Sequence, residues 1–136
     1  MSTKLTPHFT LEELTTTKTG LSNIPNVEQI NALRHLCLDI LEPLHEKLGN
    51  PLFVDSGFRS LAVNQAVGGV PTSQHLKGEA ADIHSSVKTS RIWDALNSLV
   101  INGSLNIGQC IWYRKSNFIH VSQTIVTGKQ IGRAHV

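Results

Sequence analysis

Hydrophobic positions recur at intervals of three and four along residues 26–48, which predicts one long helix with a single buried face. Pro43 lies within this stretch, and we expect a kink there because a proline ring removes a backbone donor and crowds the preceding turn. The same spacing predicts a second helix over residues 89–100. Two shorter helices are predicted at residues 11–16 and 61–67.

Apolar and polar side chains alternate over residues 105–113 and again over 118–122, which predicts two strands joined as a hairpin. Shorter strands are predicted at residues 52–54 and around Asp82. Helices interspersed with a few short, mostly hairpin-connected strands favour an α+β fold, with the helices packed on a small antiparallel sheet.

The length and composition of the chain are those of one ordinary globular domain. It has 136 residues, of which 40% are hydrophobic and 16% charged. We assign residues 1–128 to a single domain and residues 129–136 to a tail. The closing I-G-R-A-H-V of this tail resembles the translation of a sequencing adapter, which indicates a cloning or sequencing artefact.

The charge pattern narrows the choice of partners. A net charge of +2, without a stripe of clustered Lys and Arg, gives no indication of nucleic-acid binding but suits a weak attraction to an anionic cell wall. The N-terminus lacks the apolar core of a signal peptide, and no stretch approaches the roughly 20 apolar residues that a membrane span needs. We expect a monomer made in a cytoplasm and not inserted in a membrane. Cys37 and Cys110 lie in apolar runs and are interpreted as buried free thiols.

The segment Thr72–Ile83 carries the strongest chemical signal, because it places an imidazole, His75, and a carboxylate, Asp82, on either side of a glycine. Alternation in Phe118–Ser122 puts His120 on the polar side of a second strand. Each strand can then bury one face and present a ligand from the other. Two imidazole nitrogens and one carboxylate oxygen suit Zn²⁺ and leave a fourth position for water. The alternative, a capped core histidine with an unrelated loop aspartate, does not explain the ordered set of three.

These residues also carry a resemblance to a known family. The pattern S-x-H-x-x-G-x-A-x-D from Ser73 to Asp82, followed by H-V-S at residues 120–122, resembles peptidase family M15, the zinc D-Ala-D-Ala carboxypeptidases and phage endolysins. The likeness extends over roughly residues 8–123 and includes S-G-F-R-S at residues 56–60. It implies a fold shared with the hedgehog signalling domain, a Zn²⁺ cofactor, and the peptide stem of peptidoglycan as substrate.

The resemblance also implies roles for residues around the metal. Arg59 would face the substrate, where its planar guanidinium suits a peptide carbonyl or carboxylate; the alternative is a surface charge. Ser73 and Gln74 would contact substrate, and Trp112 is a further expected wall residue.

One departure from the family pattern affects the expected activity. The family usually has a carboxylate three or six residues before the last histidine, to accept a proton from water, and those positions hold Asn117 and Arg114 here. No Asp or Glu follows Asp94, so a base would have to come from elsewhere, such as Glu79, Asp55 or a neighbouring histidine.

Two functions therefore remain open. The first is a zinc metallopeptidase, encoded by a phage or prophage, that acts on the bacterial cell wall as an endolysin or D,D-carboxypeptidase. The second is a zinc-bearing module that binds cell-wall peptide with weak catalysis.

Overall fold

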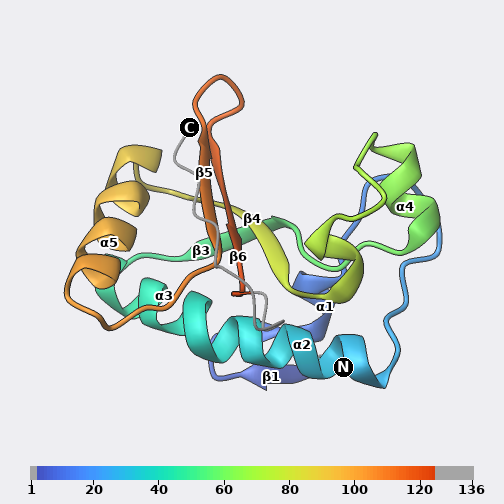
Figure 1. Cartoon of the computed structure of the whole chain (residues 1–136), viewed down its shortest axis with the longest axis horizontal. Coiled ribbons are helices and arrows are strands. Elements are labelled where there is room, and N and C mark those ends of the chain that lie inside the picture. Colours follow the sequence, from blue (N-terminus) through green and yellow to red (C-terminus); the bar gives the residue numbers. More distant parts are fainter. Residues whose placement is uncertain (1–2, 125–136) are drawn as a thin grey trace.

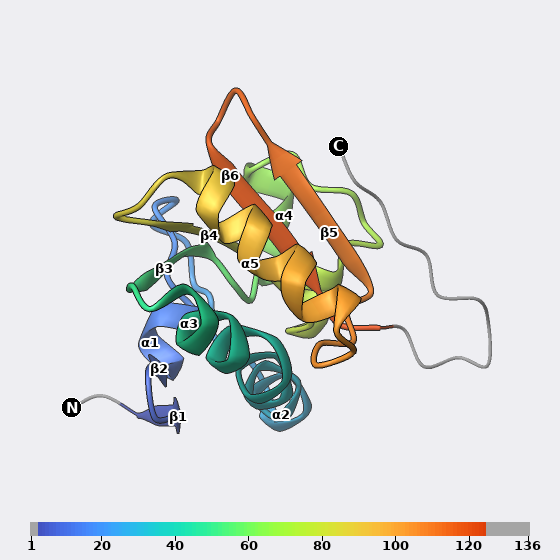
Figure 2. The ribbon, with the colours of Figure 1, turned by 90° about the vertical axis from the view of Figure 1, so that its left-hand side faces the viewer.

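The computed structural model describes residues 3–124, in which a four-stranded antiparallel sheet is covered on one face by helices (Figures 1 and 2). The order of the strands in this sheet is β3 (Leu52–Ser56), β4 (Ala80–Ser85), β6 (Phe118–Ser122) and β5 (Gln109–Tyr113). Strands β5 and β6 form the predicted hairpin. The α+β architecture expected from the sequence is confirmed. The tail at residues 129–136 lies outside the described residues, and the domain boundary at residue 128 stays a prediction.

The predicted long helix is present as three consecutive segments. It runs as α2 (Val27–Leu36), a π-helical segment at Cys37–Leu41, and α3 (Glu42–Leu48), and it ends at Gly49 with φ of 71°. The π segment explains how Pro43 is tolerated, because the wider turn relieves the crowding that a proline ring causes in an α-helix. In this wider turn the backbone N–H of Glu42 donates to the carbonyl of Cys37, five residues back.

The remaining elements are short. The predicted helices are α1 (Leu11–Leu14), α4 (Leu61–Ala66) and α5 (Thr89–Ile101). A two-stranded sheet of β1 (Lys4–Thr6) and β2 (Phe9–Thr10) was not predicted, because strands of three and two residues are too short to show alternation. Within residues 3–124, no helix is both long and apolar enough to cross a membrane.

The two faces of the sheet have different roles. Strand β4 pairs with β6 so that Ala81 lies opposite Val121 and Ile83 opposite Ile119, and all four side chains are completely buried against the helices. Between them Asp82 lies opposite His120, on the other face. The alternation read from the sequence is therefore confirmed, and it directs the polar side chains of both strands away from the core.

The core lies between the sheet and the helices. It is built from apolar residues of the long helical stretch, α5 and the inner face of the sheet; its fully buried large members include Leu33, Leu36, Ile40, Leu41, Leu44, Ile83, Ile92, Leu96 and Ile119. Cys37 and Cys110 are buried free thiols, as predicted. The site face of the sheet thus rests on a packed layer that fixes the positions of β4 and β6.

Candidate metal centre

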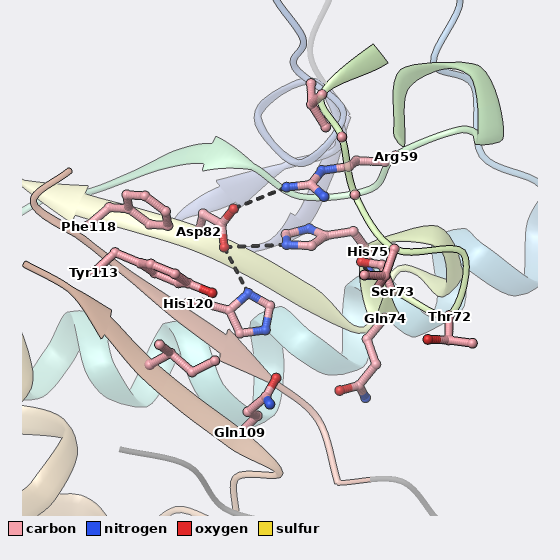
Figure 3. Close-up of a pocket in the computed structure, with 15 residues that line it drawn as sticks. Arg59, Thr72, Ser73, Gln74, His75, Asp82, Gln109, Tyr113, Phe118 and His120 are labelled. Atoms are coloured by element: carbon pink, nitrogen blue, oxygen red, sulfur yellow. Dashed lines mark hydrogen bonds and ion pairs between the residues drawn. The ribbon is translucent and has the colours of Figure 1, made fainter. Parts of the chain in front are cut away.

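The structure brings His75, Asp82 and His120 together at one point on the site face of the sheet (Figure 3). The Asp82 Oδ1 atom lies 3.3 Å from His75 Nε2 and 2.9 Å from His120 Nδ1. One ligand atom from each residue lies within 4.8 Å of the other two. Three residues separated by up to 45 positions in the sequence therefore form one cluster, as the sequence predicted for a metal site.

His75 is held by its local backbone and not by a strand. It lies in a 3₁₀ turn, Gln74–Lys77, in which the Ser73 hydroxyl accepts a hydrogen bond from the His75 backbone N–H. The turn ends at Gly78, whose φ of 74° favours glycine. The His75 Nδ1–H donates to the Gly57 carbonyl at 2.7 Å, which assigns the ring proton to Nδ1 because a carbonyl can only accept. In the neutral ring the Nε2 lone pair is then free for a metal.

Asp82 is the electrostatic centre of the cluster. Burial by itself would raise the pKa of this carboxyl group, but hydrogen bonds from His120 and His75, together with their charges, outweigh that effect and hold the pKa well below its ordinary range. The carboxylate is therefore ionised at neutral pH. Its Oδ2 atom accepts from Arg59 Nη2 at 3.3 Å, so one oxygen faces the two imidazoles and the other faces the guanidinium.

Arg59 is fixed from three directions. Besides Asp82, its Nε donates to Ser56 Oγ at 3.0 Å and its Nη1 donates to Asn64 Oδ1 at 3.2 Å. Asn64 is almost fully buried and donates in turn to the Val70 carbonyl. The guanidinium also lines the cleft described below, so the alternative of a freely solvated surface charge does not describe this residue.

A cleft of about 730 Å³ opens over the cluster. Arg59, Ser73 and Gln74 line it together with the three clustered residues, as expected from the sequence. The Gln74 amide is already engaged, because its Nε2 donates to the Gln123 carbonyl at 3.1 Å and lies 3.4 Å from Glu79 Oε1. The further lining residues are Val67, Gly68, Gly69, Val70, Thr72, Gln109, Ile111, Tyr113 and Phe118.

The expectation that Trp112 forms part of the cleft wall requires a correction. Its ring packs on Trp93 of α5, with ring centroids 5.7 Å apart, and Trp112 is not among the residues lining the cleft. The wall contributed by β5 consists of Gln109, Ile111 and Tyr113, which alternate with Trp112 along the strand and therefore lie on the other face of the sheet. The alternation of this strand could have identified them from the sequence.

The two usual positions for a carboxylate base point elsewhere. Asn117 has a positive φ of 59° and accepts a hydrogen bond from Thr89 Oγ1 at 2.7 Å, while the Arg114 guanidinium lies 4.3 Å from the centre of the Trp112 ring. Glu79 contacts Gln74 without lining the cleft. Among the described residues that line the cleft, Asp82 is the only carboxylate.

The donor set fits a zinc-like ion. It combines two imidazoles and one ionised carboxylate, all largely buried, with an open cleft on one side. An arginine beside the carboxylate and a carbonyl beside His75 supply the outer contacts that orient ligands in metal sites. The cluster can therefore hold a divalent ion and keep one position accessible from the cleft.

Comparison with known proteins agrees with this geometry. The model of the family described as peptidase M15 matches residues 7–122, a range that contains every residue of the cluster. No curated protein matches the chain. The match covers most of the sequence, and M15 peptidases are metalloenzymes. The chain belongs to the peptidase M15 family.

Proposed function

We propose that the protein is a zinc metallopeptidase that cleaves the D-amino-acid-containing peptide stems of peptidoglycan, as a phage or prophage endolysin or D,D-carboxypeptidase. The observation that carries this proposal is the position of His75, Asp82 and His120 beneath an open cleft in a chain of this family. These three residues would hold the ion. When bound, Zn²⁺ polarises a scissile carbonyl and lowers the pKa of water.

The cleft supplies groups suited to a peptide substrate. A guanidinium has five N–H donors, and the contacts of Arg59 with Ser56, Asn64 and Asp82 use three of them. The other donors remain for a substrate carbonyl or carboxylate. Ser73 lies beside His75, and its hydroxyl can still donate to a substrate oxygen because the backbone contact uses it only as an acceptor. On the other side, Tyr113 and Phe118 stack at 4.8 Å and give the wall an aromatic surface.

A second function is favoured by one observation, the lack of a second carboxylate among the described residues that line the cleft. A positioned general base typically adds about 10²–10⁴-fold to such a reaction. Without one, the site would bind peptide and metal but turn over slowly. We therefore keep a catalytically weak binding module for cell-wall peptide as the alternative.

The deciding experiment is digestion of purified muropeptides by the metal-stripped protein, with and without added Zn²⁺, followed by chromatography of the products. The peptidase proposal expects zinc-dependent products that disappear in His120→Ala, which loses one ligand. The matched control is His35→Ala, an exposed histidine of α2, which should keep full activity. Zinc-dependent binding of muropeptide without products would favour the binding module. If the protein neither forms products nor binds muropeptide, both proposals are overturned.

Two further variants test where the proton goes if products form. Glu79 lies next to Gln74, and His84 is paired with Asp55 at 2.8 Å in a neighbouring cavity that Asp82 also lines. Glu79→Gln and His84→Gln each remove one basic group. A drop in kcat of about 10²-fold or more in one variant, with KM and zinc content unchanged, would assign the base to that residue. Unchanged kcat in both would remove both groups as candidates.

A further inference from the structure

A second cluster of metal-ligating side chains lies away from the cleft. It consists of His8, in the turn between β1 and β2, with Glu42 and His45 on α3. None of the three lines the cleft. Helix α3 packs on α5, on the helical side of the sheet (Figure 2). The cleft is lined by Asp82 and His120, whose side chains lie on the other face of the sheet.

The contacts within this cluster bring two imidazoles and one carboxylate to the same point. The His8 backbone N–H donates to Glu42 Oε2 at 2.7 Å, and His8 Nδ1 lies 2.7 Å from Glu42 Oε1. The rings of His8 and His45 have centroids 4.3 Å apart. One ligand atom from each residue lies within 4.8 Å of the others, a limit that the cleft cluster also meets.

The helix contributes its two residues at a spacing suited to a metal. Glu42 and His45 are three positions apart, so they lie on one face of α3, and Glu-x-x-His is the spacing that metal sites in helical bundles use. An ion pair between His8 and Glu42 would not by itself require a second imidazole beside the first. The juxtaposition of all three groups is what distinguishes this cluster from an ordinary surface pair.

We propose that His8, Glu42 and His45 form a second, open site for a divalent transition-metal ion, with Zn²⁺ as the probe ion. Tetrahedral coordination with bonds of about 2.0–2.2 Å places ligand atoms roughly 3.3–3.6 Å apart, so ligand atoms that lie within 4.8 Å of one another need to move closer by at most about 1.5 Å. His8 can make such a movement because it lies in a turn and its side chain is 55% exposed. The same exposure leaves the remaining coordination position to water.

Metal binding here would act on the N-terminal segment. The β1–β2 sheet has strands of only three and two residues, and the bonds from His8 to Glu42 tie its turn to α3. An ion held by both elements would replace these bonds with coordination to both imidazoles and the carboxylate. The site therefore serves as a clamp between the N-terminal hairpin and the helical layer, and it takes no part in peptide cleavage.

The test counts zinc ions per chain. The full chain is stripped with a chelator, titrated with Zn²⁺ by calorimetry, and analysed for metal after dialysis. We expect two ions in the parent, and one in His8→Gln, His45→Gln or His75→Gln. The combination of His45→Gln with His75→Gln should bind none stoichiometrically. His35→Gln, which removes an exposed histidine of α2, is the matched control and should keep two.

The outcomes separate this site from the one in the cleft. Loss of an outer contact typically weakens metal affinity about 10–100-fold, so loss of a direct ligand should lower the zinc affinity of the affected site by at least that much. The zinc affinity of the other site should stay within about twofold of the parent value. The ion held by His8, Glu42 and His45 should raise the Tm of the parent and of His75→Gln when zinc is added. His45→Gln should lack this contribution to its Tm. A single ion in the parent, lost in His75→Gln and retained in His45→Gln, would overturn the second site alone. A single ion retained in His75→Gln and lost in His45→Gln would support the second site and remove the first.

Discussion

Replacing Arg59 by lysine separates its contact with Asp82, which the structure shows, from the substrate contact that we propose for it. The guanidinium donates to Asp82 Oδ2, and its other nitrogens are fixed by Ser56 and Asn64. A lysine ammonium is a single point of charge on a flexible stem, so it cannot occupy the three directions of the planar fork. We expect Arg59→Lys to retain a positive charge near Asp82 and to lose the defined orientation of its carboxylate.

The expected size of the effect follows from the lost contacts. A hydrogen bond that involves a charged group contributes about 1.5–3 kcal/mol to stability, so losing the contacts of the guanidinium with Ser56 and Asn64 predicts a decrease of about 3–6 kcal/mol in the free energy of unfolding. For a chain of this size that is a fall in Tm of roughly 12–24 °C. Removing an outer contact of a metal ligand typically weakens metal binding about 10–100-fold, and we expect zinc affinity to fall within that range.

The measurements are thermal unfolding of the metal-stripped protein and competition for Zn²⁺ against a chromogenic chelator. The matched control is Arg34→Lys on α2, where the exposed guanidinium has a single hydrogen bond, to Asn31; its Tm and zinc affinity should remain those of the parent. If Arg59→Lys binds zinc as tightly as the parent and melts at the same temperature, Arg59 does not orient Asp82. A large loss of muropeptide binding in such a variant would instead assign Arg59 to the substrate alone.

Other predictions concern the glycine after His75 and the buried thiols. Gly78→Ala should destabilise the fold by about 2–4 kcal/mol, because a left-handed backbone costs an alanine about 1–2 kcal/mol and the new Cβ would lie 2.6 Å from the Gln29 carbonyl oxygen. Gly103→Ala has the same kind of φ but no atom within 4 Å of the new Cβ, so it should lose only the cost of the left-handed backbone, about 1–2 kcal/mol. Equal losses of stability in the two variants by denaturant titration would contradict the role of the Gln29 contact. Burial raises the pKa of Cys37 and Cys110 from 9.0 to about 12, so neither thiol should react with iodoacetamide in the folded protein at pH 8. Alkylation as fast as in the unfolded chain would refute the burial of the thiols. Because their pKa is higher in the folded protein than in the unfolded chain, these thiols stabilise the fold below pH 9, and this contribution should be lost between pH 9 and about 12.

The elements that could be predicted from the sequence are those in which apolar residues recur at a regular spacing. Helix α5 and the helical stretch from Val27 to Leu48 were identified because each has a long apolar stripe. Pro43 was recognised as a perturbation, but a proline can be accommodated by a kink, a break or a wider turn, and only the tertiary packing selects the π segment. The β1–β2 sheet was missed because its strands, of three and two residues, are too short to show an alternating pattern.

The site was predictable to the extent that its residues lie on regular strands. Asp82 and His120 face the same way because both strands alternate and pair with these two residues opposite each other. His75 was found from its motif, but its proton assignment depends on the Gly57 carbonyl, which is 18 positions away. Trp112 was expected on the cleft wall, whereas strand parity turns its ring toward Trp93 of α5.

The arrangement around Asp82 would couple the proposed metal binding to the proposed substrate binding. One carboxylate oxygen faces both imidazoles and the other faces Arg59, so a change on either side alters the charge and orientation seen by the other. A substrate carboxylate that binds the cleft side of Arg59 would compete with Asp82 for the guanidinium and would therefore also change how firmly Asp82 is oriented. Zinc affinity and muropeptide affinity should then depend on each other, and by linkage the factor must be the same in both directions. Zinc affinity measured with and without a non-hydrolysable muropeptide analogue tests this coupling: equal values would show that Arg59 binds substrate without disturbing Asp82, and unequal values would show that the peptide is sensed through the carboxylate.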